Sequence, residues 1–407
     1  MIYVLNSNRR VYKIILGIKY METLVLNAGS SSVKFKFFDD ETCLLSGLIE
    51  EIGNENSRVK WEFEGIKKEE KMPLKNHKEA LNEVIKILKQ HFDLKKISCI
   101  SHRVVHGGEE FKDTVLITEK ILEKLEATSY LAPLHNPPAI LGIKLMKELL
   151  PGKKNVAVFD TSFHSSIPEK AYLYGLPYEY YEKYKIRRYG FHGTSHKFVA
   201  KEAIDKLKKK NAKIITCHLG NGASIAATLD GKSMDTSMGF TPLEGLVMGT
   251  RSGSLDPTII SFLSEKEKLT PKEVDNILNK KSGMLGISKL SSDMRVLNDE
   301  YDKNKLAKIA LDIYAYNVLK FIGSYAAVLN GIDAIVFTAG IGENDWRIRE
   351  LVLENLGYLG IKIDKKKNMK KEFIITTDDS KVPVFIIKTN EELQMVRETK
   401  KLLEKSK

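Results

Sequence analysis

The chain has few cysteines and lacks the spacing that cysteines adopt in disulfide-rich or zinc-binding proteins. Only Cys43, Cys99 and Cys217 occur among 407 residues, and no two of them form a CxxC pair. An odd number without regular spacing excludes a disulfide framework and a zinc ribbon. Because each cysteine lies in an apolar run, we expect three buried thiols in a reducing cytoplasm.

Long hydrophobic runs are also missing. No stretch reaches the roughly 20 apolar residues that a transmembrane helix needs, so we expect no membrane partner. Residues 1–20 superficially resemble a secretory signal, but Lys13 and Lys19 interrupt the apolar stretch and no small-residue cleavage site follows. We interpret residues 1–20 as an extension outside the core and Met21 as the functional start.

Acidic residues are in deficit. There are 53 Asp and Glu against 65 Lys and Arg, which gives a net charge of +12. Much of the excess lies in the lysine runs at 206–210 and 365–371. These runs lack interleaved aromatic residues, and no nucleic-acid-binding motif accompanies them. We therefore interpret them as solvated surface and expect no nucleic-acid partner, although a positive field can attract small anionic substrates.

The chain does contain two segments of the form strand, glycine turn, strand. In the first, residues 24–38, an apolar run leads into the turn Asn27–Ser30, and apolar residues then alternate with lysines. A period of two indicates a half-buried strand. In the second, residues 214–229, the turn Gly220–Gly222 separates two apolar runs, and we predict a tight turn with positive φ. Two such units indicate two topologically similar halves.

Strands and helices alternate along the remaining sequence, which is typical of an α/β protein with mixed sheets. The predicted strands span residues 97–105, 155–159, 334–338 and 384–387. The predicted helices span residues 80–91, 137–150, 306–329 and 391–405. The third helix is apolar on most faces, so we expect it to be buried on most sides. The length favours two domains, which we assign to residues 21–160 together with about 386–407, and to residues 161–385.

The second glycine turn and a later arginine segment suggest chemistry. Small residues at a turn let backbone N–H groups approach an anion. The segment Gly249–Gly253 holds Arg251 among glycines and serines, where nothing crowds a guanidinium group away from a phosphoryl oxygen. A phosphate-binding turn followed by a presented arginine indicates phosphoryl transfer. Residues 340–344, which follow a predicted strand, form a third glycine turn that precedes a helix at Trp346.

Four further motifs place polar side chains at strand ends or in loops stiffened by proline or flanked by glycine. These side chains are Arg103, His106, His135, Asp160 and His192. Each alone is equally compatible with a structural salt bridge or a helix cap, but together with two phosphate turns they favour a function. His102 and His106 lie too far apart along a strand to share one zinc ion.

In order along the chain, these motifs resemble those of the acetate kinase family. They are Asn27–Lys34, Ser101–Glu109, Phe159–His164, Arg188–His196, His218–Ser224, Gly249–Pro257, Gly340–Asn344 and Thr389–Leu393. The resemblance runs from Met21 nearly to the C-terminus without a departure at a motif position.

The resemblance implies a fold, a reaction and partners. The fold is two duplicated actin-like ATPase (ribonuclease H-like) domains, with mixed sheets flanked by helices around a central cleft, as in sugar kinases and heat-shock-70 chaperones. The reaction is ATP + acetate ⇌ ADP + acetyl phosphate in the cytoplasm, with Mg²⁺, or Mn²⁺ as an alternative, and the enzyme is usually a homodimer.

The resemblance also implies site residues. The catalytic residues would be Arg103, Asp160, His192 and Arg251. Acetate would contact Arg103, Val105, Leu134, His135, Phe191 and Pro242. The nucleotide would contact Lys34, His218, Leu219, Gly220, Asn221, Gly222, Asp293, Met294, Arg295, Gly340, Ile341, Gly342, Glu343 and Asn344. The metal would bind Asn27 and Glu391. Because acetate is already ionised at neutral pH, we expect Asp160 to position groups rather than remove a proton.

Two alternatives remain open at this stage. A propionate or butyrate kinase would use the same mechanism, and one methylene changes binding by only ~1–3 kcal/mol. A nucleotide-dependent structural or chaperone protein could share the fold. Against it, a protein that merely binds or hydrolyses ATP has no need for the three cationic or hydrogen-bonding groups Arg103, His192 and Arg251.

Overall fold

The structure, a computed structural model, describes residues 21–405, so our expectation for residues 1–20 lies outside it. The chain divides into two compact units. Unit 1 comprises the described residues up to His106, Asp113–Phe159 and the residues from Glu392 onward; unit 2 comprises Gly107–Lys112 and Asp160–Glu391. Among the described residues, no helix is long and apolar enough to cross a membrane.

Unit 1 is built on an eight-stranded mixed sheet. Its strands are β1 (Glu22–Ala28), β2 (Ser32–Asp39), β3 (Thr42–Glu50), β4 (Ser57–Phe63), β5 (Ile66–Met72), β6 (Ile97–Val104), β7 (Val115–Leu116) and β8 (Lys154–Phe159). Their order in the sheet is β5-β4-β3-β2-β1-β6-β8-β7. β1, β6 and β8 run parallel, and the other pairings are antiparallel.

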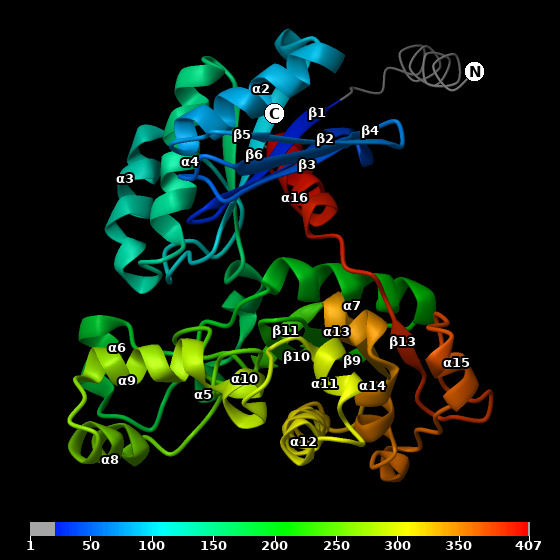
Figure 1. The fold of residues 1–407 in the computed structure, drawn as a ribbon. Helices are drawn as coiled ribbons and strands as arrows, with labels where there is room; N and C mark the ends of the chain where they lie inside the picture. Colours follow the sequence, from blue (N-terminus) through cyan, green and yellow to red (C-terminus); the bar gives the residue numbers. More distant parts are fainter. Residues whose placement is uncertain (1–20, 406–407) are drawn as a thin grey trace. The chain divides into compact units, whose positions relative to one another are not determined.

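Helices cover both faces of this sheet (Figure 1). They are α2 (His77–His91), α3 (Glu119–Ala127), α4 (Asn136–Leu149) and α16 (Glu391–Lys405). Side chains alternate between the faces of a strand, so Leu24 and Leu26 of β1 pack in the core with α2 and α4. Val25, between them, faces the opposite core, where it meets Met395 and Val396 of α16.

Unit 2 is built on a five-stranded sheet. Its strands are β9 (Lys213–Leu219), β10 (Ala223–Leu229), β11 (Lys232–Thr236), β12 (Ala334–Thr338) and β13 (Val384–Ile386). Its helices are α5 (Glu169–Tyr172), α6 (Tyr178–Tyr184), α7 (Gly193–Leu207), α8 (Thr258–Lys266), α9 (Pro271–Asn276), α10 (Gly283–Ser288), α11 (Met294–Asp299), α12 (Lys305–Val328), α13 (Ala339–Asn344), α14 (Trp346–Leu353) and α15 (Lys365–Met369). α7 packs on β9 and β12, while α12 covers β9 and β10 from the other side (Figure 1).

The two units repeat one strand topology. The order β11-β10-β9-β12-β13 in unit 2 matches β3-β2-β1-β6-β8 in unit 1. In both, the first three strands in sequence are antiparallel neighbours, and the last two run parallel to the first. The prediction of two similar halves, each starting with a hairpin, is therefore confirmed.

Three expectations from the sequence are wrong. α12 is buried on the side that faces the sheet, but Tyr316 is 61% exposed and Val328 50%, because the helix lies on a surface layer. Cys43 is exposed, since it lies at the start of β3 beside a hairpin turn, whereas Cys99 and Cys217 are buried as predicted. The expected glycine turn at 340–344 is helical and forms most of α13.

Candidate active site

The hairpin between β9 and β10 ends in the three-residue turn Gly220–Gly222, with Leu219 paired to Ala223. The Gly220 N–H donates to the Gly222 carbonyl, 3.1 Å away. Neither glycine nor Asn221 has positive φ, so our expectation for this turn is wrong. Instead, Gly222 lies at ordinary contact distance from two candidate side chains. A Cβ atom on Gly222 would lie 3.5 Å from Arg251 Nη1 and 3.6 Å from His192 Nε2.

His192 reaches that space from the start of α7. It is the N-cap of the helix and has φ of +55°, a conformation that costs energy for a residue with a side chain. Its ring stacks on His218 with centroids 4.2 Å apart, and its Nδ1 lies 2.9 Å from Ser224 Oγ. Such strain persists only where surrounding contacts fix the residue, which is typical of a functional position.

The backbone of Asp160 lies next to His192. Asp160 directly follows β8, and its carbonyl accepts a hydrogen bond from the N–H of Gly193 at 2.9 Å. The two chain segments approach so closely that a Cβ atom on Gly193 would overlap the Asp160 carbonyl oxygen. Asp160 itself is buried. Unit 2 therefore brings Asp160, His192 and the hairpin turn together.

Arg251 lies in a loop that is hydrogen-bonded to the same turn. The N–H of Gly249 donates to the Asn221 carbonyl at 3.1 Å, and the carbonyl of Arg251 accepts from Met248 at 3.1 Å. Arg251 Nη1 donates to the Pro242 carbonyl at 3.1 Å. Burial lowers the pKa of the Arg251 guanidinium, but arginine remains protonated in proteins. A fixed positive charge thus faces the turn.

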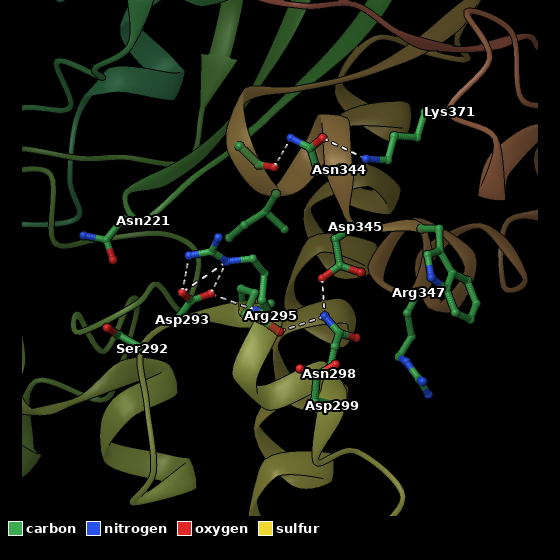
Figure 2. Close-up of a pocket in the computed structure, with 14 residues that line it drawn as sticks. Asn221, Ser292, Asp293, Arg295, Asn298, Asp299, Asn344, Asp345, Arg347 and Lys371 are labelled. Carbon is green, nitrogen blue, oxygen red and sulfur yellow. Dashed lines mark hydrogen bonds and ion pairs between the residues drawn. The ribbon is translucent and has the colours of Figure 1, made fainter.

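A cavity of about 1000 Å³ in unit 2 adjoins this turn at Asn221 (Figure 2). It is lined by Asn221, Ser292, Asp293, Met294, Arg295, Asn298, Asp299, Gly340, Ile341, Asn344, Asp345, Trp346, Arg347 and Lys371. Asp293 caps α11 and forms an ion pair with Arg295 at 2.6 Å. The volume lies at the upper end of the range for small-molecule sites, so the cavity is large enough for a nucleotide.

Seven of the predicted nucleotide contacts line this cavity. They are Asn221, Asp293, Met294, Arg295, Gly340, Ile341 and Asn344. Glu343 has a different position: its Oε1 accepts the N–H groups of Ala339 at 2.9 Å and Thr389 at 3.2 Å. This carboxylate therefore holds the start of α13 against the segment that leads to α16.

Lys371 is exposed, as predicted for its lysine run, and it also lines the cavity. Its Nζ donates to Asn344 Oδ1 at 3.0 Å, and Figure 2 shows the two side chains pointing toward each other. Two other lysines of the run form ion pairs, Lys365 with Glu350 and Lys367 with Asp378. Lys371, Asn298, Asp345 and Trp346 are lining residues that sequence reasoning missed, because they belong to no recognisable motif.

In unit 1, Asn27 and Lys34 are opposite one another in the β1–β2 hairpin. Lys34 lies 2.5 Å and Lys36 2.9 Å from the carboxylate of Glu392 in α16. Burial opposes ionisation of Glu392, but the two lysines outweigh it and lower the pKa of this carboxyl to about 2. The first turn of α16, which starts at Glu391, is therefore tied to β2.

The predicted acetate contacts of unit 1 lie in β6, directly after it or before α4. Arg103 belongs to β6, and His135 is the N-cap of α4. Leu134 is 69% exposed. His106, a strand-end candidate in the sequence, is buried, and its backbone N–H and carbonyl both bond the side chain of Asn136.

The part of the chain that the structure describes contains no group of three or more His, Cys, Asp or Glu side chains placed to hold a metal ion. His102 is not a ligand candidate, since its Nε2 bonds Asn155 Oδ1 at 2.8 Å. Burial lowers the pKa of the His102 ring to about 4, so the ring is neutral.

Comparison with known proteins identifies the family of this chain. The model of the acetokinase family matches residues 22–397. The chain belongs to the acetokinase family. It is 56% identical over 399 residues to the acetate kinase of Thermosipho africanus, an alignment that covers 95% of this chain and 98% of that one.

Solved structures of acetokinases have the same fold. The acetate kinase of Porphyromonas gingivalis matches with a TM-score of 0.89 at 41% identity, over 94% of this chain and all of that one. A propionate kinase from Francisella tularensis matches with a TM-score of 0.90 at 44% identity and the same coverage. The repeated mixed sheets with flanking helices are the actin-like ATPase fold, as the acetokinase resemblance implied.

Proposed function

We propose that the chain catalyses the reversible transfer of the γ-phosphoryl group of ATP to acetate, giving ADP and acetyl phosphate. One observation in unit 2 carries the proposal beyond family similarity. Arg251 Nη1 and His192 Nε2 border the same small space at Gly222, at 3.5 and 3.6 Å from the position of an added Cβ atom. Two donors beside one glycine turn suit a phosphoryl group, whose charge spreads over its equatorial oxygens during transfer.

The acceptor chemistry explains why the site is rich in cationic groups. A carboxylate is ionised at neutral pH and attacks without a general base. It must instead be held against repulsion from the phosphates. In this proposal Arg103 holds the carboxylate, Arg251 neutralises the phosphoryl oxygens, and His192 donates a hydrogen bond to them. The buried Asp160 positions groups beside His192.

Asn27 and Glu391 would hold Mg²⁺, with Mn²⁺ as an alternative. An amide oxygen and a carboxylate are hard ligands, and two of them leave positions for water and phosphate oxygens, as Mg²⁺ prefers. When bound, the metal supplies charge neutralisation between the phosphates. The protein would fix the position of Glu391, because the neighbouring Glu392 forms ion pairs with Lys34 and Lys36.

The large cavity of unit 2 would take the nucleoside part of ATP. Met294 and Ile341 offer apolar contacts, while Asn344, Lys371 and the Asp293–Arg295 pair offer polar ones. The cavity meets the glycine turn at Asn221, so a nucleotide lying in it can direct its phosphates toward Gly222. Because ATP is the donor, we expect the enzyme to act in the cytoplasm.

Propionate is the second acceptor to consider, because a propionate kinase is 44% identical to this chain. Val105, Leu134, Phe191 and Pro242 would surround the methyl group of acetate. A single methylene alters binding by ~1–3 kcal/mol, so we expect propionate to be used more slowly and butyrate more slowly still.

The test is a measurement of initial rates with acetate, propionate, butyrate and no carboxylate, at saturating Mg-ATP. We expect the highest kcat/KM with acetate and negligible ATP turnover without a carboxylate. A higher kcat/KM with propionate would reassign the acceptor. Carboxylate-independent ATP hydrolysis at a comparable rate would instead indicate an ATPase.

A homodimer is the expected assembly. Unit 2 leaves several large apolar side chains exposed on two helices, and a second copy of the chain is the partner that would cover them. They are Tyr178, Tyr180 and Tyr184 of α6, and Ile259, Ile260 and Phe262 of α8. Light scattering of the purified protein should give twice the mass of the chain, and Phe262→Asp should lower that mass if this surface is the interface.

A further inference from the structure

A chain of hydrogen bonds lies behind His192, entirely within unit 2. His192 Nδ1 is 2.9 Å from Ser224 Oγ, and Ser224 Oγ is 2.7 Å from His196 Nε2. His196 Nδ1 is 2.7 Å from Thr216 Oγ1. Ser224, His196 and Thr216 have no exposed surface. None of these three residues is required by the mechanism above, yet they connect to the one ring nitrogen of His192 that faces away from the glycine turn.

The contact at the Thr216 end indicates which atom is the donor in each of these hydrogen bonds. Thr216 Oγ1 lies 3.5 Å from the carbonyl oxygen of Ala226, with the geometry of a hydroxyl donor. A carbonyl can only accept, and a hydroxyl has one hydrogen to donate. With its hydrogen directed to that carbonyl, Thr216 accepts from His196, and this assignment places a proton on Nδ1 of His196.

The neutral state of His196 fixes the donor of the next hydrogen bond. Burial, and next the neighbouring His164 and His218, hold the pKa of His196 well below its usual range. A neutral imidazole has one N–H, so its Nε2 is an acceptor and takes the hydrogen of Ser224. The Ser224 oxygen is then left to accept a hydrogen bond from Nδ1–H of His192.

We propose that Ser224 and His196 are positioning residues that hold His192 in its Nδ1–H tautomer, so that Nε2 donates to a phosphoryl oxygen only when the ring carries a second proton. This inference rests on the proposed function of His192. The active ring is then an imidazolium, which adds a positive charge to that of Arg251 at the space beside Gly222.

Several groups face His192 and act on its protonation. The ring of His218 stacks against it from β9, and Nδ1 of His218 is itself bonded to Ser195 Oγ at 2.8 Å. Arg251 borders the same space and opposes a second positive charge. Asp160, whose carbonyl accepts the N–H of the adjacent Gly193, and the phosphates of a bound nucleotide add negative charge near the ring and favour its protonation. The rate of phosphoryl transfer should consequently fall as pH rises and the ring loses its second proton.

The decisive experiment is nitrogen NMR of the full-length enzyme labelled with ¹⁵N-histidine. The chain has nine histidines, and the signals of His192 are those missing in His192→Gln. In the neutral ring we expect a protonated Nδ1 and a bare Nε2. A protonated Nε2 would overturn the inference, whatever any variant does.

A second measurement follows the pH profile of kcat in Ser224→Ala. Removing the acceptor of Nδ1–H disfavours the imidazolium, so the fall in rate should shift about one pH unit lower, with kcat reduced about tenfold at neutral pH. The matched control is Ser233→Ala, another fully buried serine bonded to a histidine, His164. Its profile should keep the wild-type midpoint. An unshifted midpoint in Ser224→Ala would also contradict the inference.

These outcomes separate the inference from the proposed function. The tautomer is measured without a carboxylate acceptor. An enzyme that phosphorylates acetate but holds Nε2–H contradicts only the positioning role. An enzyme with Nδ1–H that fails to phosphorylate any carboxylate contradicts only the proposed reaction.

Discussion

The amide side chain of Asn221 fills the space that any side chain at position 249 would need. A Cβ atom on Gly249 would overlap Asn221 Oδ1, and the Gly249 N–H already bonds the Asn221 carbonyl at 3.1 Å. The loop that carries Arg251 is thus fitted directly against the glycine turn of the β9–β10 hairpin. Two motifs separated by nearly thirty residues in the sequence form one rigid structure.

This fit predicts that Gly249→Ala impairs catalysis more than stability. The added methyl group must displace the Asn221 amide or the arginine loop, and small displacements of a catalytic group cost about 10²-fold in rate. We expect kcat to fall by that order and the melting temperature by a few degrees. Gly175→Ala is the control, because a Cβ atom there has no neighbour within 4 Å. Equal activity of the two variants would argue against the fit.

Removing either proposed arginine should lower kcat while the fold survives. Arg251 and Arg103 are expected to contact charges that develop in the transition state, and the loss of one such partner costs roughly 10²–10⁴-fold. Steady-state kinetics and circular dichroism of Arg103→Ala and Arg251→Ala provide the measurement. Arg58→Ala, on β4, should retain wild-type kinetics. A near-wild-type kcat would remove the corresponding arginine from the mechanism.

The cavity position of Lys371 predicts a selective effect on ATP. Lys371→Met removes the ammonium group that holds Asn344, so the KM for ATP should rise about three- to tenfold. The KM for acetate and kcat should change little, since the loss affects binding rather than the reacting groups. Lys370→Met, in the exposed neighbouring position, serves as the matched control. A parallel rise in both KM values would point to a structural role.

The ion pairs of Glu392 with Lys34 and Lys36 predict a pH-dependent contribution to the stability of the fold. The pKa of this carboxyl is lowered from 4.5 to about 2, so its ionised form is favoured in the folded state. Its contribution is therefore complete above pH 4.5 and is lost as pH falls toward 2. Because Lys34 is about half exposed, we expect only about 1–2 kcal/mol.

Urea denaturation at pH 7 and pH 3 measures this contribution. Glu392→Gln should be less stable than wild type at pH 7, and the difference should shrink at pH 3. Glu123→Gln, on the exposed side of α3, should match wild type at both values. A difference of equal size at both pH values would mean that Glu392 acts through packing and not through charge.

Much of the fold could be predicted because buried strands have a strong local pattern. β1, β2, β9, β10 and β12 alternate or are continuously apolar, and each falls where expected. β4 and β5 were not predicted. β5 consists largely of charged residues, and its first six side chains are exposed. Only its backbone pairing with β4 makes it a strand, and that pairing is invisible to side-chain periodicity.

The site was predictable where its residues belong to motifs that contain flanking glycines. His192, Asn221 and Arg251 are examples, since nearby glycines permit the close approaches seen at Gly193 and Gly249. Lys371 and His196 act through partners distant in the sequence, Asn344 and Thr216. Such contacts depend on packing, and no local pattern indicates them.

The sheet of unit 1 ends in strands that resist extension by another chain. At one edge, β5 presents Lys67, Lys68, Glu69, Glu70 and Lys71 in a row of exposed side chains; at the other, β7 has only two residues. Exposed strand edges are templates for aggregation, and charge and shortness are the usual protections. Both edges of this wide sheet therefore oppose backbone pairing with a strand of another chain.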